Sequence, residues 1–181
     1  SLYAQGMSRK QRLSADDWLN AGLKALAASG PEALKAEPLA RALDTTKGSF
    51  YWHFEDVPRY RQALLNLWRD DSGKMPAKPS HKSEAVAQLQ TIMQDGFGGD
   101  SATETAMRSW ATSDAKAAAT IADLDKQRLA HLSDLMQQLG VTNKDLVLSL
   151  YAAKVGMGTM SGDIRNTEAL SSLVDLVLAL R

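Results

Sequence analysis

Residues 35 to 54 read Lys35-Ala-Glu-Pro-Leu-Ala-Arg-Ala-Leu-Asp-Thr-Thr-Lys-Gly-Ser-Phe-Tyr-Trp-His-Phe54 and contain two short helical patterns separated by a tight turn. The first pattern ends near residue 43, and Asp44 begins the turn. Thr46 is expected to cap the second helix by accepting a hydrogen bond from the amide of Ser49. Two helices joined in this way are typical of a helix-turn-helix, whose second helix lies in the major groove of DNA.

The second of these helices is expected to have an apolar face and a polar-aromatic face. Phe50 and Phe54 are four residues apart and therefore point inward together. Tyr51 and Trp52 are adjacent, so they cannot share one helix face, and at least one of them is expected on the surface. The alternative is that both aromatic side chains pack into the core or against the rest of the protein.

Helical patterns also surround this segment. Ser14 is expected to cap a helix that stops at Gly30-Pro31, and another helix starts near Val57-Pro58. Leu39, Ala42 and Leu43 are expected to form the inner face of the helix before the turn. Residues 74–80 contain two prolines and no periodicity, which indicates a linker. Further helical patterns follow in residues 84–97, 101–112, 114–139, 142–160 and 166–180. No segment alternates between apolar and polar residues at period two for long enough to indicate a strand. The chain is therefore predicted to be all-α.

The composition is that of an ordinary globular protein. The chain has 181 residues, 44% of them hydrophobic and 23% charged, which argues against a largely disordered protein. No apolar run approaches the roughly 20 residues of a membrane span. The absence of cysteine excludes disulfides and thiolate metal sites and fits a reducing cytoplasm. Residues 1–6 precede a plausible native start at Met7 and are expected to be a cloning remnant.

The charge balance gives little support to indiscriminate nucleic-acid binding, because the net charge is zero. From Met7 to Arg61 there are nine Lys or Arg against seven Asp or Glu, a surplus of two. A DNA-binding surface on this chain must therefore gather its positive charge locally. Arg9, Lys10 and Arg12 precede the first helix and are expected to add charge as an arm.

The block Leu39-Ala-Arg-Ala-Leu43, followed by the segment from Thr46 to Phe54, resembles the tetracycline-repressor (TetR) family of bacterial transcription regulators. Arg108-Ser-Trp-Ala111 and Asp125-Lys-Gln-Arg128 look like patterns seen in some members. The resemblance implies a DNA-binding domain with a helix-turn-helix and three helices in residues 7–56. It also implies a helical regulatory and dimerisation domain in residues 57–181, which often holds a ligand and forms a homodimer through its last two long helices.

The resemblance also implies which side chains touch DNA. Tyr51 and His53 would reach phosphates, whereas Lys47 and Trp52 would lie nearest the bases. A glycine at position 48 removes the side chain that would hold the helix away from the groove. The predicted DNA-binding residues are Thr46, Lys47, Gly48, Ser49, Tyr51, Trp52 and His53. For His53 the alternative is a structural hydrogen bond to the next helix.

The sequence departs from the family pattern near the turn and after the second helix. Asp44 stands where the family usually has a glycine, although Asp can adopt the left-handed conformation at some cost. Glu55 and Asp56 replace a basic residue and would repel phosphates if they faced them.

Large apolar side chains in the second domain could line a cavity for a small apolar or amphipathic ligand. The predicted ligand-binding residues are Trp68, Met93, Phe97, Met107, Trp110 and Tyr151, with Met157 as a further candidate. The alternative is that each of them belongs to the core or to the dimer interface.

Other reactive groups offer little support for metal binding or catalysis. His81 and His131 have no companion at ligand spacing, so no metal site is predicted. Asp123 and Asp125 lie on different helix faces and are expected to be solvated. The chain has no nucleophile with an adjacent base and no cofactor loop, so neither an enzyme nor a bound cofactor is predicted.

These observations predict a cytoplasmic, bacterial transcription regulator that binds a double-stranded DNA operator. The expected mechanism is a ligand-responsive repressor that acts as a homodimer on a palindromic operator, with a small-molecule effector of unknown identity. The alternative is a helical dimeric scaffold or ligand-binding protein that acts through protein partners.

Overall fold

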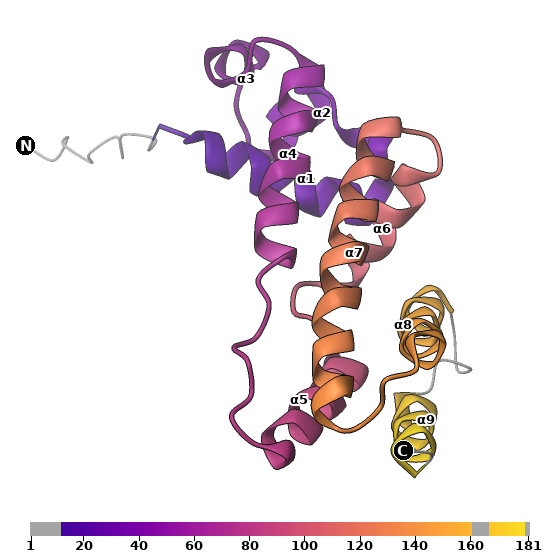
Figure 1. Ribbon diagram of the computed structural model, residues 1–181. Coiled ribbons are helices and arrows are strands. Elements are labelled where there is room, and N and C mark those ends of the chain that lie inside the picture. Colours follow the sequence, from indigo (N-terminus) through magenta and orange to yellow (C-terminus); the bar gives the residue numbers. More distant parts are fainter. Residues whose placement is uncertain (1–11, 161–166, 180–181) are drawn as a thin grey trace, which may run out of the picture.

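The computed structural model describes residues 12–160 and 167–179 of the chain, and Figure 1 shows their arrangement. Regular structure in these residues consists of α-helices and one short 3₁₀ helix, with no strand among them. The prediction of an all-α protein is therefore confirmed. None of the described helices is both long enough and apolar enough to cross a lipid bilayer.

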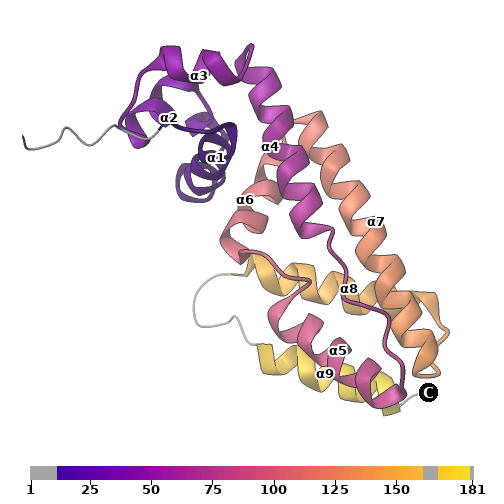
Figure 2. The same cartoon turned by 90° about the vertical axis from the view of Figure 1, so that its left-hand side faces the viewer.

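The helices at the amino-terminal side form a compact head (Figure 2). The first begins with a capping box, in which the Ser14 hydroxyl accepts from the Asp17 amide and the Asp17 carboxylate accepts from the Ser14 amide. It ends at Gly30, whose φ of 77° favours glycine. The elements of the head are α1 (Ala15–Ser29), the 3₁₀ helix η1 (Pro31–Ala33), α2 (Ala36–Ala42) and α3 (Lys47–His53).

The turn between α2 and α3 has the predicted backbone but not the predicted cap. Asp44 adopts a φ of 48°, as its place in the turn requires. Thr46 precedes α3, yet its hydroxyl makes no capping bond. The Ser49 amide donates instead to the backbone carbonyl of Thr46, at 3.0 Å. The prediction of a Thr46 side-chain cap was therefore wrong.

The buried face of α2 also differs from the prediction. Leu39 is fully buried, but Ala42 is exposed and Leu43 is only partly buried. Ala36 and Ala40 complete the inner face instead. Ala36, Leu39 and Ala40 follow the i, i+3, i+4 spacing of one helix face, and Ala42 lies off that face.

The fourth helix connects the head with the rest of the molecule. Helix α4 (Val57–Ser72) starts at Asp56, whose carboxylate caps it, and carries Pro58 in its first turn. It runs beside α7 in both views, and the extended residues 74–80 then lead to the far end of the molecule (Figures 1 and 2). The linker prediction is confirmed.

Five helices form the body. Helices α5, α8 and α9 lie at the end away from the head, while α6 and α7 extend toward it (Figure 2). Asn143 caps α8. The helices of the body are α5 (Lys82–Asp95), α6 (Ser101–Ala111), α7 (Ala115–Gln138), α8 (Lys144–Thr159) and α9 (Thr167–Ala179).

Two apolar cores hold the molecule together. The first contains Trp18 and Phe50 of the head, Tyr60 of α4, and Met107 and Trp110 of α6. The second joins α5, α7, α8 and α9. Although the predicted domain boundary falls after residue 56, side chains of α4 and α6 pack into the core of the head. A displacement of either helix would therefore disturb the packing of the head.

Candidate nucleic-acid interface and internal cavity

Helix α3 is held to the head by one face. Phe50 is fully buried and Phe54 nearly so, as their spacing predicted. The Phe50 ring meets the edge of the Trp18 ring at a centroid distance of 5.3 Å and lies 5.1 Å from the Tyr60 ring. Such aromatic contacts fix the orientation of a short helix. The opposite face of α3 is consequently held in one direction.

The outward face carries two large aromatic side chains. Trp52 exposes 71% of its surface and Tyr51 exposes 53%. The alternative in which both pack into the protein is therefore wrong. Two large rings on one short helix leave apolar surface in contact with water in the free protein. Exposed apolar surface of this kind marks binding sites, so this face of α3 is a candidate binding surface.

The other predicted DNA-contacting residues surround these rings. Thr46, Lys47 and Gly48 are exposed, whereas Ser49 and His53 are partly buried. A Cβ atom at Gly48 would meet only the Thr46 hydroxyl, at 3.7 Å, so internal packing does not require glycine there. The His53 ring packs beside Phe54 at 6.3 Å. Within the described residues it forms no hydrogen bond to α4.

The two acidic residues after α3 have local partners. The Arg59 amide donates to the Asp56 carboxylate at 2.7 Å, which caps α4. Glu55 lies 3.8 Å from the Arg59 guanidinium. Both carboxylates therefore have a partner within the first turn of α4.

Arg12 adds positive charge next to the exposed aromatic surface. Its guanidinium carbon lies 4.6 Å from the centre of the Trp52 ring, a cation–π contact between the segment before α1 and the middle of α3. Arg9 and Lys10, which were expected to belong to the same arm, lie outside the described residues. The near-neutral head thus has a cation beside the face of α3.

The body contains a cavity of about 280 Å³ between the α5–α6 loop, α6, α7 and α8. Of the predicted ligand-binding residues, Phe97 and Tyr151 line it. The others do not: Trp68, Met107 and Trp110 are in the first core and Met93 is in the second, while Met157 packs against the second core. Much of the lining is polar or charged, in contrast with the apolar lining expected from the sequence.

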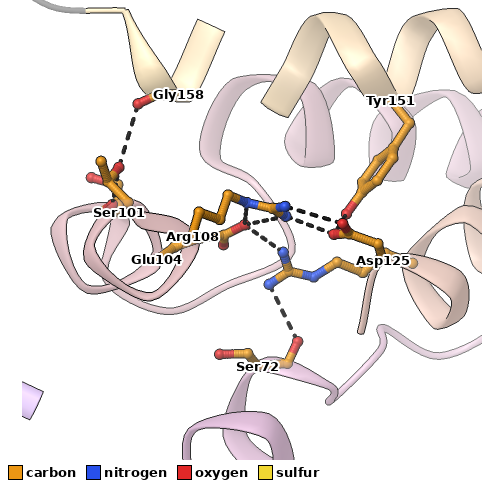
Figure 3. A network of polar contacts seen from close by, with 9 residues as sticks. Ser72, Ser101, Glu104, Arg108, Asp125, Tyr151 and Gly158 are labelled. Atoms are coloured by element: carbon orange, nitrogen blue, oxygen red, sulfur yellow. Dashed lines mark hydrogen bonds and ion pairs between the residues drawn. The ribbon is translucent and has the colours of Figure 1, made fainter. Parts of the chain in front are cut away.

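A network of charged groups lies beside this cavity (Figure 3). Arg108 of α6 donates to both oxygens of Asp125 of α7, at 2.7 and 3.1 Å. The Tyr151 hydroxyl of α8 donates to the same carboxylate at 2.6 Å. The prediction that Asp125 is solvated was wrong, because α6 and α8 cover it; Asp123 is exposed as expected.

The network continues through Glu104 to the end of α4. One Glu104 oxygen accepts from Arg108 at 3.0 Å and from Arg128 at 2.7 Å. Arg128 also approaches the backbone carbonyl of Ser72, the last residue of α4, at 3.5 Å. The segments that contain Arg108 and Arg128 were noted in the sequence, but the carboxylates that these arginines bind were not predicted. The four-residue spacing of Glu104 and Arg108 was the available signal.

These contacts shift the proton affinities of the groups involved. Burial alone would raise the pKa of Glu104, but hydrogen bonds from Arg128 and the nearby arginine charges hold that pKa below its ordinary value. For Asp125, the hydrogen bonds from Arg108 and Tyr151 likewise outweigh burial and lower the pKa. Burial, with the hydrogen bond to Asp125, raises the pKa of Tyr151 to about 12. Both carboxylates are therefore charged at neutral pH.

The histidines take structural positions. His81 precedes α5 as its N-cap residue, and the His131 ring lies 6.3 Å from the Phe97 ring. Burial lowers the pKa of His131. In the described part of the chain, no group of three or more His, Cys, Asp or Glu side chains is arranged to hold a metal ion.

Comparison with known proteins bears on the head. A family model described as the bacterial regulatory proteins of the tetR family matches residues 19–56, which include most of α1 and all of α2 and α3. Neither a curated protein nor a solved structure matches the chain. The match covers the helix-turn-helix with its exposed Tyr51 and Trp52, and this similarity over residues 19–56 supports a DNA-binding regulator of the tetR family.

Proposed function

We propose that the protein is a ligand-responsive transcriptional repressor that binds a palindromic operator as a homodimer in the bacterial cytoplasm. The observation that carries this proposal is the exposed face of α3, where Tyr51 and Trp52 stand outward while Phe50 anchors the helix. A rigid helix that presents rings and a cation is suited to the major groove.

In the proposed complex, α3 supplies both kinds of DNA contact. Lys47 and Trp52 would lie nearest the base edges, and Tyr51 and His53 would donate to phosphates. Thr46, Gly48 and Ser49 would lie along the DNA backbone at the side of the groove. Arg12 would add a phosphate contact next to Trp52, because the cation–π contact already holds it beside α3.

Dimerisation is proposed through α8 and α9. Leu148 of α8 exposes 51% of its surface and Leu176 of α9 exposes 57%. Val155 and Ala152 continue the apolar surface of α8 at helical spacing. Figure 1 shows both helices on the side of the body away from α4. Two copies joined by this surface would place two α3 helices on one side of the dimer.

The ligand response would be a shift between two arrangements of the dimer. A molecule bound in the cavity beside Arg108 and Tyr151 would favour the arrangement in which it binds more tightly. Repression would be lost if that arrangement separates the two α3 helices by a distance that does not match the operator.

The experiment is an electrophoretic mobility-shift titration with the DNA that flanks the protein's own gene. We expect a sequence-selective shift that weakens as salt is raised. Lys47→Ala and Tyr51→Ala should each weaken it at least tenfold, whereas Lys82→Ala, which changes an exposed lysine on α5, should leave it unchanged.

A protein that binds no DNA in a sequence-selective way, over a range of salt, would contradict the proposal. A scaffold that acts through protein partners would behave differently, because its function would survive the double change of Lys47 and Tyr51 to Ala.

A further inference from the structure

Arg128 is a buried cation whose hydrogen-bonding capacity is only partly used. It exposes 2% of its surface and lines the cavity in the body. Its Nη1 donates to Glu104 at 2.7 Å, while its Nη2 reaches the Ser72 carbonyl at the long distance of 3.5 Å. Among the described residues, no acceptor is within hydrogen-bonding distance of its Nε.

The unpartnered Nε and the weakly bound Nη2 of Arg128 lie on one edge of the guanidinium. Nε and Nη2 point in parallel from that edge, and a carboxylate can accept from both at once. A buried donor without an acceptor costs free energy that a ligand oxygen would recover. The geometry of the edge therefore matches a planar group with two oxygens.

The neighbouring arginine has more of its donors occupied. Arg108 donates four hydrogen bonds of 3.2 Å or less, two to Asp125 and two to Glu104. Lys154 stands at the edge of the cavity and donates to the carbonyls of Met93 and Gln94. Of the two arginines, Arg128 has the greater capacity left for an incoming acceptor.

Aromatic and glycine residues surround this edge. The Phe97 ring lies 5.2 Å from the Arg128 guanidinium carbon and 6.2 Å from the Tyr151 ring. Gly98 and Gly99 follow in the same loop with φ of 104° and 86°. A Cβ atom at Gly99 would lie 3.9 Å from the Ser72 hydroxyl, so the loop passes close to the end of α4. An apolar skeleton can thus lie against Phe97 while its polar group faces Arg128.

We propose that the cavity binds a small organic carboxylate, whose two oxygens accept from Nε and Nη2 of Arg128 and whose skeleton packs against Phe97. This inference rests on the proposed function, in which the cavity holds the effector. The bound carboxylate would draw Nη2 away from the Ser72 carbonyl. Binding would thereby loosen the contact between the cavity and the end of α4, the helix that packs into the head.

The test is a thermal unfolding experiment on the full chain with matched pairs of probes at equal ionic strength. Benzoate and hexanoate are the carboxylates, and benzamide and hexanamide are their neutral counterparts. Millimolar benzoate or hexanoate should raise Tm by about 2 °C or more, because a ligand that binds the folded state stabilises it. The amides and inorganic phosphate should leave Tm within the error of the measurement.

Two variants locate the site. Arg128→Gln should lose the response to both carboxylates, whereas Arg69→Gln, which removes a partly exposed arginine of α4, should keep it. If Arg128→Gln does not fold, the comparison of each carboxylate with its amide on the wild-type chain decides whether the protein binds the carboxylate group. Equal shifts with benzoate and benzamide, equal shifts with phosphate, or no shift with either carboxylate would overturn the proposal.

The outcomes separate this inference from the proposed function. Sequence-selective DNA binding without a carboxylate response would overturn the ligand class and leave the DNA-binding regulator intact. A carboxylate response that Arg128→Gln abolishes, in a protein that binds no DNA, would support the site and overturn the repressor.

Discussion

The hydroxyl of Tyr60 on α4 donates a hydrogen bond of 2.8 Å to the backbone carbonyl of Trp18 on α1, 42 residues earlier. Both side chains are fully buried, and burial raises the pKa of Tyr60, so its hydroxyl remains a donor at neutral pH. The bond joins the first helix of the head to the helix that leads into the body. The position of the head relative to α4 depends on this contact.

Removing this hydroxyl should destabilise the protein. Tyr60→Phe deletes the bond to Trp18 while keeping the ring, so we expect the free energy of unfolding to fall by about 1 kcal/mol. Urea unfolding followed by tryptophan fluorescence measures the change. Tyr51→Phe is the control, because that hydroxyl is exposed, and its effect should stay within about 0.5 kcal/mol. Equal losses in the two variants would contradict the interpretation.

The close approach of α4 to α1 requires glycine at position 22. A Cβ atom there would collide with the Tyr60 hydroxyl and would lie 3.1 Å from Leu64. Gly22→Ala should therefore cost roughly 1–3 kcal/mol of stability, despite the better helix propensity of alanine. In the double variant with Tyr60→Phe, the removed oxygen should relieve part of this loss. Strictly additive losses in urea unfolding would show that the two positions do not interact.

Arg12 should contribute one phosphate contact to DNA binding. Its guanidinium is held over Trp52, so Arg12→Ala should weaken binding to all sequences and lower the slope of log affinity against log salt by about one. Fluorescence anisotropy titrations over a series of salt concentrations measure the slope. Lys82→Ala serves as the matched control far from α3. An unchanged slope in Arg12→Ala would place this arginine outside the interface.

The charged network should make stability depend on acidity. The pKa values of Glu104 and Asp125 in the folded protein are lower than their ordinary values of 4.5 and 3.8. The stabilisation that these carboxylates give to the folded state is therefore complete when the pH is above the ordinary values. It is lost as the pH falls through the lower folded values, where the unfolded chain binds more protons. Wild type should accordingly be more stable than Asp125→Asn at neutral pH, and this difference should narrow on acidification. A difference that stays constant with pH in urea unfolding would contradict the role of the carboxylate.

The exposed leucine of α9 should be needed for self-association. Leu176→Glu would place a carboxylate in the proposed apolar dimer surface, where desolvation costs several kcal/mol. We expect the dissociation constant of the dimer to rise more than about a hundredfold in sedimentation equilibrium. Gln90→Glu, an exposed change on α5, should leave the dimer intact. A wild-type chain that is monomeric at all concentrations would reject the surface altogether.

Much of the head was predictable because its signals are local. Ser14 and Gly30 mark the ends of α1 through capping groups that lie within a few residues of the helix. The spacing of Phe50 and Phe54 places both on the buried face of α3. The adjacency of Tyr51 and Trp52 predicted that at least one of them is exposed, and the structure exposes both. In these cases the physical cause and the sequence pattern cover the same short segment.

The predictions that were wrong depended on neighbours that are distant in the sequence or on the exact centre of a helix face. Ala42 points to solvent because Ala36, Leu39 and Ala40 share the buried face at i, i+3 and i+4 spacing, and Ala42 lies off that face. Thr46 leaves its hydroxyl uncommitted because its own carbonyl already receives the Ser49 amide. The polar lining of the cavity was missed because the sequence pattern marks apolar side chains, whereas much of the lining comes from polar groups on α5, α6, α7 and α8 and on the loop between α5 and α6.

The sequence by itself determined that the chain is helical, where α1 and α3 begin and end, and which side of α3 faces outward. Tertiary structure decided the charge pairs: Arg108 meets Asp125, 17 residues away, and Arg128 approaches Ser72, 56 residues away. The physical reason is that helix periodicity sets only the direction of a side chain. The partner it meets depends on how α4, α6, α7 and α8 pack, and that packing is a property of the whole core.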